Sequence, residues 1–153
     1  DSALMITKSE NVSDGDGFGD VAVDGYGYIY AVDYPLPTSR CGGDIRKSPP
    51  GGELIPSWKG VRKDGSPVSC VWDVEVDGYG YVYLLNGEGV DKFDSDGNQV
   101  DFERAYFDVG LAVDGHGNVY GVNHSWLDSA SYAEGNVSVF ENLKFSPEGV
   151  LIP

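Results

Sequence analysis

The fold is decided by a short pattern that occurs three times: DVAVDGYGYIYAVD at residues 20–33, DVEVDGYGYVYLLN at residues 73–86 and GLAVDGHGNVYGVN at residues 110–123. Each copy reads as strand, turn and strand. The Asp-Gly-x-Gly segment supplies the turn, because aspartate bonds to its own backbone and glycine accepts a positive φ. The flanking arms are rich in Val, Ile and Tyr, which favour strands. The pattern therefore predicts three β-hairpins in an all-β chain.

A second hairpin is expected after each of the first ones. Residues 89–100 form it in the second copy, residues 43–55 in the first and residues 136–152 in the third. Each unit is then four antiparallel strands, and units begin about 40 to 50 residues apart, which is the period of a propeller blade.

The motif Val-Asp-Gly-x-Gly-x-(Ile/Val)-Tyr, followed by a Lys-Phe strand and Asp-x-Asp-Gly, resembles the NHL repeat and, more broadly, the gluconolactonase-like propellers. The resemblance covers residues 18–152 and implies a β-propeller-like array of three four-stranded antiparallel blades. The predicted division of the single domain 1–153 is an N-terminal strand and turn at 1–17, blade 1 at 18–58, a linker loop at 59–70, blade 2 at 71–102 and blade 3 at 108–153.

Three blades are too few for a closed ring, since propellers usually hold four to eight. The expected shape is an open arc or half of a six-bladed ring, with an unpaired face at each end. Such faces favour self-association into a ring or a filament, or pairing with missing blades on another chain.

A basic stretch within residues 40–63 is a second candidate for assembly, because six basic residues there face only two acidic ones. A basic loop on an acidic body can contact the acidic face of another copy, whereas the alternative is a solvated loop screened by salt. The basic residues are Arg40, Arg46, Lys47, Lys59, Arg62 and Lys63.

The overall charge bounds the partners. Asp and Glu number 25 against 10 Lys and Arg, which gives a formal net charge of −15. Such a surface repels phosphates and disfavours binding to nucleic acid. No stretch of 18 consecutive apolar residues is present, so no transmembrane helix is expected.

Several features predict an extracellular protein. The chain begins at Asp1, as expected if a leader was removed or if the chain is a piece of something longer. Glycosylation sequons begin at Asn11, Asn123 and Asn136. Cys41 and Cys70 are the two cysteines, and a disulfide between them is predicted, with two free thiols as the alternative.

Two groups of side chains are candidates for ligand binding. Asp14, Asp16 and Asp20 offer oxygen ligands at spacings suited to calcium, although ordinary hairpin turns also explain them. Tyr26 and Tyr79 lie at turn tips, where they are expected to stack on a sugar or on a partner.

No catalytic motif is present: Gly-x-Ser-x-Gly, His-Glu-x-x-His and a phosphate-binding loop are all missing from the sequence. We therefore predict a secreted, non-enzymatic structural protein that needs no cofactor and assembles through its open blade flanks. The alternatives are an extracellular module that binds a glycan or a protein, and part of a metal-dependent lactonase-like enzyme that would need a complete ring.

Overall fold

The computed structural model of the chain consists of strands, turns and loops in the part that it describes. That part comprises residues 17–34, 45–52, 55, 58–68, 70–103, 105, 107, 110–125 and 139–152. The strands form three antiparallel sheets, which confirms the predicted all-β class. Within these residues, no helix is long and apolar enough to cross a membrane.

Each sheet is built from consecutive strands. Sheet 1 has the order β1 (Gly17–Val23), β2 (Ile29–Tyr34) and β3 (Ile45–Ser48). Sheet 2 has the order β4 (Val71–Val76), β5 (Val82–Asn86) and β6 (Gly89–Phe93). In sheet 3, whose order is β10-β9-β8-β7, the strands are β7 (Gly110–Val113), β8 (Val119–Ser125), β9 (Val139–Phe145) and β10 (Leu151–Ile152).

The first hairpin of every sheet is the predicted strand–turn–strand unit. Val23 pairs with Ile29 in sheet 1, and Val76 pairs with Val82 in sheet 2. The last glycine of each Asp-Gly-x-Gly turn has a positive φ, which glycine adopts at no steric cost. These φ angles are 84° at Gly27, 87° at Gly80 and 82° at Gly117.

The prediction of four strands in every blade holds for sheet 3 alone among the described residues. In sheet 1, the place of the fourth strand holds a single bridge between Lys47 and Ile55. In sheet 2, Gln99 bridges to Phe93, but its backbone N–H donates to the carbonyl of Val61, 3.3 Å away. Val100 N–H also donates to the Lys92 carbonyl at 2.9 Å, so the segment pairs with β6 only around this bridge, and the linker loop pairs with its other edge.

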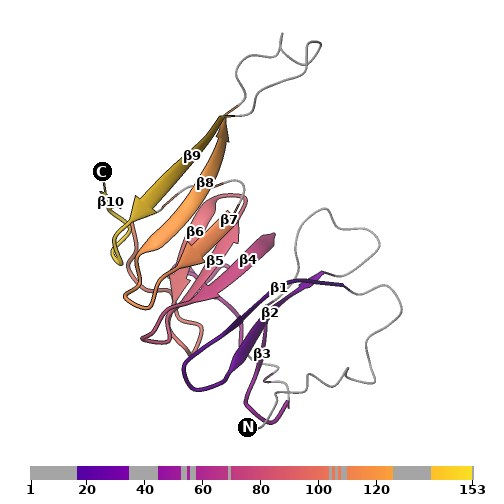
Figure 1. The fold of residues 1–153 in the computed structure, drawn as a ribbon. Coiled ribbons are helices and arrows are strands. Elements are labelled where there is room, and N and C mark those ends of the chain that lie inside the picture. The colour runs from indigo at the N-terminus through magenta and orange to yellow at the C-terminus, as the bar shows by residue number, and fades with distance from the viewer. Residues whose placement is uncertain are drawn as a thin grey trace, which may run out of the picture.

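The three sheets follow one another in chain order (Figure 1). Their first strands lie together, because β1 packs against β4 and β4 packs against β7. One apolar core fills the space between sheets 1 and 2, with Tyr30, Trp58 and Val74 among its fully or almost fully buried members. A second core, which includes Tyr83 and Phe107, lies between sheets 2 and 3. The described residues contain no sheet closed on itself.

Candidate assembly site

The turn aspartate of each hairpin ties together the turn and a buried tyrosine. In sheet 2, Asp77 Oδ1 accepts the backbone N–H groups of Tyr79 at 2.9 Å and Tyr81 at 3.0 Å. Its Oδ2 accepts the hydroxyl of Tyr83 at 3.0 Å. Asp24 and Asp114 make the same set of contacts in the other two sheets. The aspartate is therefore the local cause of both the turn and the tyrosine position.

A lysine at one repeat position connects each sheet to the next. Lys47 Nζ lies 5.1 Å from the centre of the Tyr30 ring and donates to the carbonyl of Ser95 in the turn after β6, at 2.6 Å. Lys92 Nζ lies 5.1 Å from the Tyr83 ring and donates to the carbonyl of Pro147 at 3.0 Å. Each lysine thus links a tyrosine of its own sheet to a turn of the following sheet.

An aspartate at the start of the first strand makes a second recurring link. Asp20 Oδ2 accepts the backbone N–H of Val74 at 2.9 Å, and Asp73 Oδ2 accepts that of Leu111 at 3.0 Å. The strand register shifts beside both aspartates, as at a β-bulge. Such a shift changes the direction of groups that would otherwise pair within the sheet. The joint between sheets 1 and 2 is therefore repeated between sheets 2 and 3.

The carboxyl group of Asp73 has a raised pKa. Burial first, then a hydrogen bond with Asp20 and the charges of Asp20 and Glu75, raise the pKa of Asp73 to about 7, although the Leu111 N–H opposes the rise. Burial and then Asp20 also raise the pKa of Glu75. Asp73 therefore keeps its proton over most of the acidic range and donates it to Asp20.

This proton makes stability depend on pH in a defined direction. Folded Asp73 releases its proton near pH 7, whereas the ordinary aspartate value is 3.8. Between these values the folded state binds more protons than the unfolded state, so the free energy of unfolding falls as the pH rises.

The variant Asp73→Asn tests this dependence. Its amide can donate to Asp20 and accept from Leu111 N–H without titrating, so the variant should melt at a higher temperature than the wild type at pH 8 and at a similar temperature at pH 4. Thermal melts of Asp96→Asn, which removes an exposed charge, control for the overall negative charge. The same difference between Asp73→Asn and wild type at both pH values would contradict the raised pKa of Asp73.

No described residue covers the outward face of sheet 1. Val21, Val74 and Leu111 occupy one repeat position, yet Val21 is 52% exposed while Val74 is 0% and Leu111 is 8% exposed. The difference arises because a preceding sheet covers Val74 and Leu111, whereas no described residue covers Val21. Val23, two residues on, is also exposed.

Sheet 3 leaves the opposite face uncovered. Tyr120 is half-buried, although its equivalents Tyr30 and Tyr83 are fully buried. A shallow depression of about 390 Å³ lies beside Tyr120 and is lined also by Ala112 and Val122. Lys144 lies with its Nζ 5.3 Å from the Tyr120 ring, and no described residue supplies the carbonyl that its equivalents bind. Among the described residues, sheet 1 thus presents the exposed Val21, and sheet 3 presents the partly exposed Tyr120.

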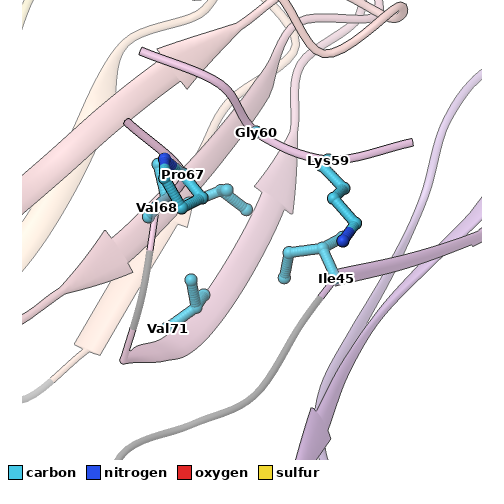
Figure 2. A pocket seen from close by; sticks show the side chains of 7 residues that line it. Ile45, Lys59, Gly60, Pro67, Val68 and Val71 are labelled. Carbon is cyan, nitrogen blue, oxygen red and sulfur yellow. The ribbon is translucent and has the colours of Figure 1, made fainter. Parts of the chain in front are cut away.

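A smaller cavity of about 140 Å³ lies where the linker loop meets sheets 1 and 2 (Figure 2). Ile45, Val68 and Val71 line it, with the Lys59 side chain beside Ile45. Among the described residues that line it, Lys59 is the one titratable residue, and the others are aliphatic residues, proline and glycine. This lining suits packing rather than acid–base chemistry.

One of the three predicted calcium ligands lies among the described residues. Asp14 and Asp16 lie outside them. Asp20 is described, and its carboxylate binds the Val74 N–H. Among the described residues, no group of three or more His, Cys, Asp or Glu side chains is arranged to hold a metal ion. The calcium site stays a prediction.

The basic stretch is largely engaged within the molecule. Lys47 is buried, Arg62 Nη2 lies 2.9 Å from both Asp91 Oδ2 and Glu88 Oε2, and Lys63 forms an ion pair with Asp101. Arg46 and Lys59 are exposed, and Arg40 lies outside the described residues. These intramolecular partners leave less of the stretch for contacts with another copy than its sequence indicates.

The remaining predicted residues fall in different places. Tyr26 and Tyr79 are 79% and 69% exposed at their turn tips, as a binding role requires. Cys70 is disulfide-bonded, while Cys41 lies outside the described residues, so the pairing itself stays a prediction. Asn123 lies in β8, and the other two sequons lie outside the described residues.

Sequence reasoning missed the linking role of the lysines. The signal was present, because a lysine recurs at positions 47, 92 and 144 on the strand that follows each Tyr-rich arm. Grouping Lys47 with the neighbouring basic residues hid this periodicity. Gly110 stands where the other copies have the linking aspartate, and this departure is visible in the sequence.

No protein-family model matches this chain. A search of curated proteins also finds no match. The functional interpretation therefore depends on the geometry above.

Proposed function

We propose that this chain is a secreted, non-enzymatic structural protein whose three sheets are successive blades of an NHL-like propeller, and that its two open faces mediate assembly. The observation that carries the proposal is the difference in exposure at equivalent positions. Val21 is exposed where Val74 and Leu111 are buried, and Tyr120 is partly exposed where Tyr30 and Tyr83 are buried.

The repeated links between sheets support the blade interpretation. One lysine-to-carbonyl bond and one aspartate-to-backbone bond join sheets 1 and 2, and an equivalent pair of bonds joins sheets 2 and 3. The packing of β1 on β4 and of β4 on β7 also suits first strands gathered near one axis.

The disulfide at Cys70 supports secretion, since structural disulfides persist in oxidising compartments. A net charge of −15 on each copy opposes close approach. Assembly by apolar faces should therefore strengthen with salt, because salt screens the repulsion while leaving apolar burial intact.

Sedimentation velocity over a range of protein concentrations, at 0.05 M and 0.5 M NaCl, tests the proposal. We expect the weight-average mass to rise above 16.4 kDa with concentration, and to rise further at high salt. A mass of one chain at every concentration and both salt levels would refute assembly. An association that is instead lost at high salt would point to the basic stretch as its cause.

A further inference from the structure

We infer that assembly proceeds head to tail: the open face of sheet 3 in one copy binds the open face of sheet 1 in a second copy, through the same contacts that join the sheets within one chain. This inference depends on the proposed function and specifies its joint. We expect a second copy at each open face, because the two faces are complementary. The sheet 3 face has an apolar depression and a lysine, and the sheet 1 face has an exposed valine and a turn carbonyl.

The apolar part of the joint follows from the repeat. Within the chain, Val74 lies in the same buried cluster as Tyr30, between sheets 1 and 2. Tyr120 is the equivalent of Tyr30, and Val21 is the equivalent of Val74. The depression beside Tyr120 therefore corresponds to the seat of Val74, and the exposed Val21 of a second copy has the chemistry to fill it.

The polar part of the joint is a lysine and a turn carbonyl. Lys47 and Lys92 donate to the carbonyls of Ser95 and Pro147, each two residues before a turn glycine of positive φ. These glycines are Gly97 at 91° and Gly149 at 88°. Sheet 1 has the same turn, with Gly52 at 83° and an exposed Pro50 two residues before it.

The equivalent bond across the joint therefore runs from Lys144 Nζ of one copy to the Pro50 carbonyl of the next. Lys144 already lies over the Tyr120 ring, as Lys47 and Lys92 lie over theirs. Its ammonium group is thus held close to the face on which the second copy would bind.

One link is missing from the joint. Gly110 stands where Asp20 and Asp73 bind the following strand, so sheet 3 has no carboxylate for the backbone N–H of Val21 in the next copy. The joint between copies should therefore be weaker than the joints within a chain, and association should be reversible. A β-carbon at Gly110 would meet nothing within 4 Å, so an aspartate fits there.

A mixing experiment tests the head-to-tail arrangement. Val21→Asp places a charge on the sheet 1 face, and Val122→Asp places one on the sheet 3 face, at a position whose equivalents Val32 and Leu85 are buried within the chain. Val21 is exposed and Val122 is partly exposed, so both variants should fold. We expect each variant alone to sediment as a monomer and the equimolar mixture to form a dimer, since one undamaged joint remains. Dimers of either variant alone, or no dimer in the mixture, would overturn the arrangement.

Two further variants test the named contacts by sedimentation equilibrium. Lys144→Met should raise the dissociation constant about ten-fold, and Gly110→Asp should lower it about ten-fold, because each changes one charge-assisted hydrogen bond. Lys59→Met and Gly87→Asp make the same charge changes at exposed sites in the linker and in the turn between β5 and β6, away from both open faces, and serve as controls. Association that persists unchanged in both test variants overturns this joint while leaving assembly intact; a monomeric wild type overturns both.

Discussion

Replacing Asp77 with alanine is expected to lower the free energy of unfolding by about 3 to 5 kcal/mol. The carboxylate is 3% exposed and accepts two backbone N–H groups of its turn as well as the Tyr83 hydroxyl. Alanine leaves that hydroxyl buried with only the Gly117 carbonyl nearby, at 3.5 Å. Urea denaturation of dilute protein followed by tryptophan fluorescence measures the loss.

Asp94→Ala is the matched control for Asp77→Ala. Asp94 also accepts two backbone N–H groups, from Asp96 at 3.0 Å and Asn98 at 2.9 Å, but its turn carries no buried tyrosine. Its loss should cost about 1 kcal/mol. If the two substitutions prove equally costly, then the Asp77–Tyr83 hydrogen bond does not contribute as we argue.

Replacing Gly121 with alanine is expected to destabilise the chain by about 3 kcal/mol. A β-carbon at this position would overlap the ring of Phe107, which is fully buried and packs edge-on against Phe145 at 5.3 Å between ring centres. The equivalent residues Ala31 and Leu84 carry side chains, so the glycine belongs to the packing of Phe107 and not to the repeat.

Gly25→Ala is the control for Gly121→Ala. A β-carbon at Gly25 meets nothing within 4 Å, and its φ is not positive, so the substitution should change the stability by less than about 0.5 kcal/mol. The two variants are compared by urea denaturation in the same buffer. An unchanged midpoint for Gly121→Ala would show that the Phe107 ring does not occupy this space.

The hairpins were predictable because their causes are local. Asp77, Gly80 and Tyr83 lie within seven positions of one another, and their contacts follow from the spacing alone. The exposed Tyr26 and Tyr79 were predictable for the same reason, since turn tips project into solvent. Sequence reasoning therefore recovered the repeated unit and the all-β class.

The contacts between sheets could not be predicted in the same way, because they join residues far apart in the chain. Lys47 binds Ser95, and Asp20 binds Val74, across distances that no local pattern encodes. Asp20 looked like a calcium ligand and Lys47 like part of a basic surface, since sequence alone shows neither partner. The fourth strand of sheet 2 was overestimated, because the segment after β6 pairs with it only around the bridge between Phe93 and Gln99.

We propose that the open faces of sheets 1 and 3 bind one another between copies. Electron microscopy of the purified protein, at a concentration where sedimentation detects association, tests it most directly. We expect particles built from whole three-sheet units joined end to end, either as a closed ring of two copies or as a filament. Images of separate three-sheet particles with both end faces bare, or of copies joined through any other surface, would contradict it.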